Sequence, residues 1–235
     1  MATKSIDIPG VGAVTIYKRR GARNLRVSVT ADGKIRVTMP TWLPFKAGEQ
    51  FALSRADWLQ QNQVPAPVVL RHGHQLGKAH RLHFEARASQ TIATRISLTE
   101  VRVLHPSTMQ PDHPEVQRKA TAAGLRALKQ EAQQLLPGRL KGLAGEHGFS
   151  FGGVDVKQLK SRWGSCNSMQ DITLNIFLMQ LPWHLIDYVL LHELTHTRVM
   201  QHGKPFWDEL QKHLPNAKAL RQEINTYQPL LMPYD

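Results

Sequence analysis

The stretch YVLLHELTH at residues 188–196 restricts what this chain can fold into more than any other part of the sequence. A helix advances about 100° per residue, so His192 and His196 project from one face and can reach a single ion. Glu193 lies beside them. The pattern H-E-x-x-H on a helix is typical of catalytic zinc sites, where two neutral imidazoles bind the metal and the glutamate acts on its water. The stretch therefore predicts a helix that carries a metal site.

The residues around this motif predict that the helix is largely buried. Pro182 suits a first helical turn. Most of the helix circumference is apolar, through Leu185, Ile186, Val189, Leu190, Leu191 and Leu194. Because Leu185 and Val189 share the side that carries both histidines, the imidazoles face a dry interior and need partners. This favours a bound metal over two histidines that are merely hydrogen-bonded in a core.

The sequence offers two candidates for a third ligand. His202 would lie about 240° from the ligand face if the helix continued, so the chain must turn first, and Gly203 and Pro205 are suitable stop signals. The spacing equals that of metzincins, but Val199 stands where they have glycine. Glu209, on the following predicted helix, is the competing candidate. We favour His202, which completes the usual catalytic set of three protein ligands and a water.

Length and composition bound the class of protein. The 235 residues permit one or two domains with a substantial core. No apolar run approaches the roughly 20 residues of a membrane span, and residues 1–7 lack the apolar centre of a signal peptide. The single cysteine, Cys166, cannot form an internal disulfide, which fits a reducing compartment. We therefore expect a cytoplasmic protein without a membrane partner.

The charge of the chain raises the hypothesis of an anionic partner. Thirty Lys and Arg residues against 18 acidic residues give a net charge of +12, which would attract nucleic acid or a nucleotide. The densest basic stretch holds Lys18, Arg19, Arg20, Arg23 and Arg26, with Tyr17 as its one aromatic neighbour. Most such stretches are solvated faces, so charge alone does not establish binding.

The first 104 residues are predicted to be mainly β-structure. A strand is expected at residues 13–18, and alternating apolar residues on both sides of Asp32-Gly33 predict a hairpin with one buried and one basic face. A short amphipathic helix is expected to cover this sheet with Phe51, Leu53, Trp58 and Leu59. Further strands are predicted at residues 68–71, 81–85, 95–98 and 101–104.

A second histidine-rich stretch contains His72, His74, His80 and His83. It lies among the turn residues Gly73 and Gly77, so these histidines are predicted to be at the surface. A second metal site is the disfavoured alternative, because no carboxylate or cysteine is suitably spaced with them.

Residues 105–114, HPSTMQPDHP, are predicted to be a linker because their three prolines oppose both helix and sheet. This gives a β-rich N-terminal domain over residues 1–104 and a second domain over residues 115–235. The second domain should begin with a helix that breaks at Pro137-Gly138 and a further helical piece that ends at Gly148. Strands at residues 154–163 and 172–178, then helices, should follow. The predicted fold class is α+β.

Three features together resemble one known family. They are SRWGSC at residues 161–166, the strand ITLN at residues 172–175, and HELTH followed by His202-Gly203 and Phe206-Trp207. With them the chain is similar to the YgjP-like zinc metallopeptidases, which are related to the SprT-like and gluzincin-like proteases. The resemblance is densest over residues 155–210. One departure is Gly203, where the family often has serine.

The resemblance implies a zincin-like catalytic domain in which the strand near Ile172 lies along the active-site cleft. It makes His192, His196 and His202 the ligands of one Zn²⁺ and Glu193 the general base. The implied function is a zinc metallopeptidase that hydrolyses peptide bonds in a peptide or protein substrate.

The residues near the motif have further candidate roles. Arg162 is a candidate for binding a substrate anion or a developing oxyanion. Trp163 is predicted to be a core residue, Gly164-Ser165 a turn, and Cys166 a small packing residue rather than a nucleophile. Tyr188 and Tyr227 are candidates for oxyanion stabilisation that the sequence does not place.

Three other functions stay open. The same zinc chemistry could hydrolyse a non-peptide substrate such as a nucleotide phosphoanhydride. The protein could be a nucleic-acid-associated protease, as the SprT-like relationship suggests. The metal could be purely structural, but such sites are normally closed by four protein ligands, often with cysteine, and only Cys166 is present.

Overall fold

The computed structural model describes residues 2–29, 34–61, 68–160, 162–227 and 229–231. The fold is mixed α+β, which confirms the predicted class, and it contains three small sheets within these ranges. The chain divides into two compact units between Val68 and Val69, here called the N-terminal unit and the C-terminal unit. None of the described helices combines the length and the apolar composition that crossing a bilayer requires.

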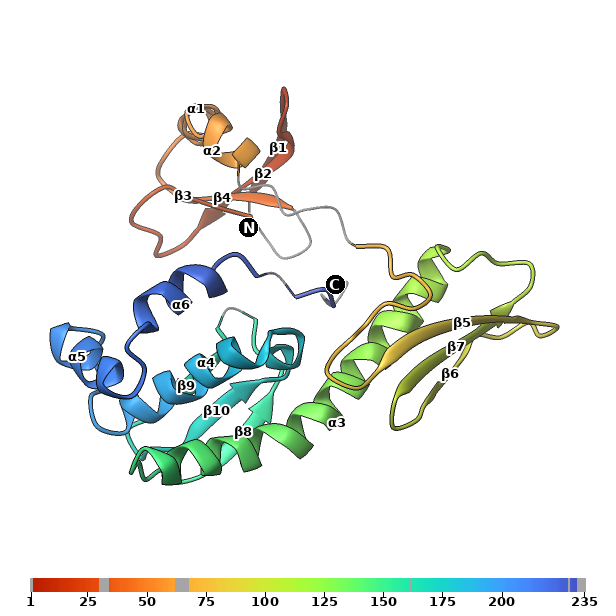
Figure 1. Ribbon diagram of the computed structural model, residues 1–235. Helices are drawn as coiled ribbons and strands as arrows, with labels where there is room; N and C mark the ends of the chain where they lie inside the picture. The colour runs from red at the N-terminus through yellow and green to blue at the C-terminus, as the bar shows by residue number, and fades with distance from the viewer. Residues whose placement is uncertain (1, 30–33, 62–67, 161, 228, 232–235) are drawn as a thin grey trace. The chain divides into compact units, whose positions relative to one another are not determined.

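The N-terminal unit is built on a four-stranded sheet in the order β1-β2-β4-β3 (Figure 1). Its strands are β1 Thr3–Ile8, β2 Gly12–Arg19, β3 Arg26–Val29 and β4 Ile35–Pro40. β2 and β4 are parallel, while β1 pairs antiparallel with β2 and β3 with β4. The predicted strand and the antiparallel pairing are confirmed; the Asp32-Gly33 turn lies outside the described residues.

Burial alternates along this sheet as its sequence predicts. One face forms the core with Ile8, Val14, Ile16, Ile35, Val37 and Met39. Residues of opposite parity lie on the other face, where Arg26 and Arg36 are exposed. The period-two pattern thus places apolar residues against the helices and basic residues in solvent.

Two helices, α1 Phe45–Leu53 and α2 Ala56–Gln61, replace the single helix that the sequence predicted. Gly48 lets α1 approach the sheet, because a Cβ there would lie 2.9 Å from Cγ2 of Ile16. The prediction that Leu53 and Trp58 cover the sheet is wrong: they are 53% and 43% exposed.

The C-terminal unit begins with a second sheet packed on a long helix. The sheet has the order β5-β7-β6, with β5 Arg81–Arg87, β6 Ala93–Ile96 and β7 Glu100–Pro106. The helix is α3, Pro114–Glu146. Residues 68–71 are not a strand, contrary to the prediction. Leu82 and Val103 of the sheet share one core with Ala120 and Leu128 of α3.

This packing places the division between units elsewhere than predicted. The prolines of residues 105–114 delimit elements within one unit, because Pro106 ends β7 and Pro114 begins α3. Proline suits both places, since a first helical turn needs no donor from it. The division at Val68 and Val69 therefore differs from the predicted linker.

α3 is one continuous helix that contains Pro137, so the predicted break there is wrong. Proline removes one backbone hydrogen bond, but Leu136 and Leu140 on either side of it are fully buried. Their burial in the core offsets the lost bond. The helix ends where Gly148 adopts a φ of +68°, a conformation that favours glycine.

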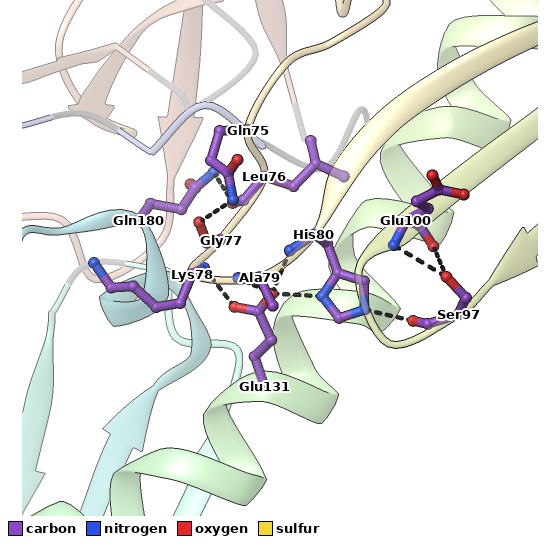
Figure 2. Close-up of polar contacts among 10 residues, drawn as sticks. All are labelled: Gln75, Leu76, Gly77, Lys78, Ala79, His80, Ser97, Glu100, Glu131 and Gln180. Carbon is purple, nitrogen blue, oxygen red and sulfur yellow. Dashed lines mark hydrogen bonds and ion pairs between the residues drawn. The ribbon is translucent and has the colours of Figure 1, made fainter.

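A buried carboxylate ties the histidine-rich stretch to α3 (Figure 2). Glu131 accepts hydrogen bonds from the backbone N–H groups of Lys78, Ala79 and His80 at 2.6, 3.0 and 3.0 Å, and contacts Nδ1 of His80. His80 is 5% exposed, so the prediction that it is a surface residue is wrong. Its partner lies 51 residues away in sequence, which spacing rules cannot detect.

The rest of the C-terminal unit surrounds the HELTH helix. A third sheet has the order β8-β10-β9 and consists of β8 Val154–Lys157, β9 Gly164–Cys166 and β10 Ile172–Asn175. A 3₁₀ helix, η1 Ile176–Gln180, leads into α4 Trp183–His196, α5 Lys204–His213 and α6 Ala217–Ile224. α3 packs along this sheet as well as along the previous one (Figure 1).

Two strand predictions in this region need correction. Of the predicted strand at residues 154–163, the described residues 154–160 and 162–163 form only the short β8, and the strand predicted at residues 172–178 ends at Asn175. Gly164-Ser165 is not a turn, because both residues belong to β9, which pairs antiparallel with β10. The reversal lies at residues 167–171, where Gln170 has a φ of 64°.

Candidate metal centre

Three imidazoles converge at the C-terminal end of α4. His192 and His196 project from α4, and His202 reaches them from the loop that precedes α5. Nε2 of His202 lies 2.9 Å from Nε2 of His192 and 3.1 Å from Nε2 of His196. Among the described residues, these three histidines form the one cluster of three side chains that could together hold a metal ion.

Phe206 holds the three rings together from α5. Its side chain is fully buried. Its ring centroid lies 4.8 Å from that of His192, 4.6 Å from that of His196 and 4.8 Å from that of His202. The turn after Thr197 brings both Phe206 and His202 back against α4. Packing of one aromatic ring thus orients all three imidazoles.

The geometry of the three nitrogens fits a tetrahedral metal. Zn–N distances of about 2.0–2.1 Å in a tetrahedron separate neighbouring nitrogens by about 3.4 Å, close to the observed 2.9 and 3.1 Å. Nδ1 of His196 lies 3.1 Å from the carbonyl of Val199. If Nδ1 carries the proton and donates it there, Nε2 of His196 presents a lone pair to the centre of the triad.

Hydrogen bonds alone cannot satisfy the three Nε2 atoms that face one another. Nε2 of His202 carries at most one proton, so it can donate to His192 or to His196 but not to both. A metal ion at the centre would accept all three lone pairs, so the residues present fit a metal.

The electrostatic environment keeps the imidazoles neutral, which is the form that binds metals. Burial, then the neighbouring His196, His202 and Arg221, lowers the pKa of His192 to about 3. The pKa values of His196 and His202 are also lowered, mainly by burial.

Glu193 lies in the same helix with its carboxylate buried beside β9. Its side chain is 5% exposed. Burial raises the pKa of Glu193 to about 8, although the positive charge of Arg162 opposes this rise. A Cβ on Gly164 would lie 2.8 Å from Oε1 and Cγ of Glu193, so only glycine lets β9 approach this closely. The SRWGSC string thus supplies the strand that covers the carboxylate.

Asn175 fixes the loop that leads into β9. It is 3% exposed, and its Nδ2 donates to the carbonyls of Leu159 at 3.0 Å and Arg162 at 2.7 Å. Its backbone N–H donates to the carbonyl of Trp163 at 2.9 Å. The ITLN strand therefore positions Arg162 and Trp163, while Ser161 of the same string lies outside the described residues.

The three histidines and Glu193 line one pocket of about 510 Å³. Besides the three histidines and Glu193, it is lined by residues 162–166, Tyr188, Val189 and Met200, by Arg221 and Ile224 of α6, and by Asn225 just after α6. β9 contributes to this lining and β10 does not, so the strand beside the site is β9 rather than the expected strand at Ile172. Tyr188 lines the pocket, whereas Tyr227 is not among its lining residues.

Comparison with known proteins identifies the family. The chain matches the YgjP-like family, described as a YgjP-like metallopeptidase domain, over residues 23–227. The chain belongs to this family. Membership implies a catalytic metal, for which the three histidines form a possible site.

Two solved structures are similar to part of the chain. The metallopeptidase zymogen of Pyrococcus abyssi abylysin has 27% sequence identity and a TM-score of 0.34, covering 37% of this chain and 89% of that chain. The zymogen of Methanocaldococcus jannaschii jannalysin has 19% identity and a TM-score of 0.33, with the same coverage. No curated protein matched the chain.

The competing ligand candidate, Glu209, is engaged elsewhere. Its carboxylate accepts hydrogen bonds from Lys212 at 2.7 Å and Arg198 at 2.6 Å. These bonds, foremost that from Lys212, lower its pKa to about 2. Glu209 does not line the pocket.

Arg221 and Asn225 line the pocket but were not predicted as site residues. Arg221 lies on α6 and Asn225 just after it, 25 and 29 residues beyond His196, and no spacing rule connects them to the HELTH motif. The amphipathic pattern of α6, with Leu220 and Ile224 buried, is the one feature that places them near α4.

Proposed function

We propose that this chain is a zinc-dependent metallopeptidase in which His192, His196 and His202 hold one Zn²⁺ and Glu193 is the general base. The observation that carries the proposal is the convergence of three Nε2 atoms beside a buried carboxylate in one pocket. Family membership supports peptide hydrolysis as the reaction. The proposed architecture is a β-rich N-terminal unit followed in the sequence by a zincin-like catalytic unit.

The bound metal would polarise the scissile carbonyl and lower the pKa of water to about 7. Glu193 would take a proton from the attacking water on its carboxylate and deliver it to the leaving amine. Its low exposure excludes bulk water from that carboxylate. A cation beside Glu193 favours the ionised carboxylate, which is the form a base requires. β9 is proposed as the strand along which the substrate lies.

Two observations favour a second candidate, hydrolysis of an anionic non-peptide substrate such as a nucleotide phosphoanhydride. Arg162 and Arg221 both line the pocket, and the chain carries a net charge of +12. Phosphate release from nucleoside triphosphates, with protein substrates untouched, would favour it.

The exposed basic face of the N-terminal sheet, with Arg26 and Arg36, supports nucleic-acid association as an accessory role. It predicts binding that weakens steeply with salt.

Metal content and turnover test the proposal directly. The wild-type protein should contain about one zinc per chain, and His202→Ala should lose it or bind it far more weakly. Glu193→Gln should keep the zinc and lose about 10²- to 10⁴-fold in kcat on a protein substrate such as casein, because that is the usual contribution of a general base.

Each variant has an outcome that contradicts the proposal. A wild-type protein without metal would contradict the zinc site. Full zinc in His202→Ala together with loss in Glu209→Ala would move the third ligand to Glu209. Unchanged turnover in Glu193→Gln would contradict the assigned base.

A further inference from the structure

The pocket beside the histidine triad contains two arginines from separate elements. Arg162 precedes β9 and Arg221 lies on α6, 59 residues further along the chain.

Neither guanidinium forms an ion pair within the described part of the chain. Other arginines of the same unit are held by carboxylates: Arg139 contacts Asp187 at 2.6 Å, and Arg198 contacts Glu209 at 2.6 Å. Glu193 is the one carboxylate among the residues that line the pocket, and it forms no ion pair with either arginine. Two permanent positive charges therefore face the pocket, and neither is held in an ion pair by the described residues.

Arg221 is held in place by contacts that do not consume its hydrogen-bond donors. Its guanidinium lies over the ring of Trp207, 5.0 Å from the centroid, which is a cation–π contact. The Trp207 ring is in turn 6.4 Å from that of His192. Leu220 and Ile224, 6% and 5% exposed, fix α6 on either side of Arg221. The arginine is thus positioned near the triad with its N–H groups available to a ligand.

We infer that Arg162 and Arg221 bind a carboxylate of the substrate adjacent to the scissile bond, and so select peptides that carry a negative charge there. A planar guanidinium matches a carboxylate with two parallel hydrogen bonds. The carboxylate can be the free C-terminus of a peptide or an acidic side chain. This inference rests on the proposed metallopeptidase function and adds its substrate class.

Calorimetric binding of short peptides tests the inference in the metal-free and in the zinc-loaded full-length protein. N-acetyl-dialanine with a free carboxylate is compared with its amide, and N-acetyl-Ala-Glu-Ala-amide with the corresponding Gln peptide. The metal-free protein removes direct ligation of the carboxylate by zinc as an explanation. The two peptide pairs separate a C-terminal carboxylate from an acidic side chain.

At least one carboxylate peptide should bind more tightly than its neutral partner in both forms. Arg221→Gln should weaken that binding by about 10- to 100-fold, the usual range for hydrogen bonds to a charged group, and leave the neutral peptide unaffected. Arg221→Lys should be intermediate because it keeps the charge without the paired donors. Arg118→Gln on α3 is the matched control, since it removes the same charge from an exposed position outside the pocket.

Equal binding of the charged and neutral peptides would overturn the inference. So would carboxylate binding that survives in both Arg162→Gln and Arg221→Gln. Failure of the proposed function would show differently, as absence of zinc or of turnover, while the metal-free titrations would still report on the arginines.

Discussion

Replacing Gly164 by alanine tests whether the close approach of β9 sets the position of Glu193. A Cβ at this residue would lie 2.8 Å from Cγ and Oε1 of Glu193 and 3.0 Å from its Cδ. Favourable carbon contacts need about 3.5–4.0 Å, so one side must move by about 0.7–1 Å. β9 is held by pairing of Leu174 with Gly164 and of Thr173 with Ser165. The carboxylate of Glu193 should therefore move.

The expected loss of activity follows from that displacement. A misplacement of about 1 Å costs about 10²-fold in rate, so kcat of Gly164→Ala should fall by about 10- to 100-fold. Overpacking should lower the free energy of unfolding by about 1–3 kcal/mol. Zinc content should stay at the wild-type value, because none of the three histidines is among the near contacts of this glycine.

Steady-state kinetics, metal analysis and thermal unfolding of Gly164→Ala together separate these effects. Gly142→Ala in α3 is the matched control, because a Cβ there meets nothing within 4 Å and alanine favours a helix. It should keep wild-type kcat and be at least as stable. A folded Gly164→Ala protein with wild-type kcat, or one that has lost its zinc, would refute the reasoning.

Two further predictions concern stability and the lone thiol. In Glu131, burial raises the pKa, but hydrogen bonds from His80 and three backbone N–H groups outweigh it and the net pKa is lowered. The stability it contributes is therefore present above its ordinary value of 4.5 and lost as pH falls through the lower folded-state pKa. Glu131→Gln should lose about 2–3 kcal/mol at pH 7, and urea unfolding should show this difference shrinking below about pH 4.5; a pH-independent difference would contradict it. Burial, then Glu193 and Asp171, raises the pKa of the Cys166 thiol, so Cys166→Ala should retain zinc and kcat, and a loss of turnover at unchanged zinc content would indicate a catalytic thiol.

Local sequence patterns predicted the elements whose partners are near in sequence. α4 follows from helical spacing of apolar residues over about four turns, and it carries His192, Glu193 and His196 as predicted. The pairing of β3 with β4 follows from alternation on both sides of a short turn. In both cases the residues of the buried face lie within a single stretch of sequence, so the periodicity of apolar residues is sufficient to predict the element.

Features that depend on distant partners could not be predicted in this way. Pro137 continues α3 because tertiary burial of its neighbours outweighs local propensity. His80 is buried because Glu131 lies opposite it, and Arg221 reaches the pocket because α6 folds back on α4. The last two of these contacts join segments more than 20 residues apart. The third histidine was the intermediate case: spacing left both His202 and Glu209 as candidates, and it is the loop before α5 that brings His202 beside His192 and His196.

The segment at residues 76–80, just before β5, contacts both α3 and the residues that lead into the HELTH helix. Glu131 of α3 holds the segment at residues 78–80, and Lys78 in turn donates its Nζ to the carbonyl of Leu181. Gln180 donates to the carbonyl of Leu76 at 2.9 Å (Figure 2). Gln180 and Leu181 lie just before α4. Contacts with Leu76 and Lys78 therefore hold the segment that leads into the HELTH helix.

The same dependence extends to α3. Gln117 exchanges two hydrogen bonds with the backbone of Leu70, at 2.7 and 2.9 Å, and both groups are buried, so cutting the chain at the predicted linker would leave them unsatisfied. The β5-β7-β6 sheet and the HELTH helix thus belong to one compact unit, in which α3 and the segment at residues 70–80 form hydrogen bonds that connect its parts. The proline-rich segment at residues 105–114 therefore lies within this unit.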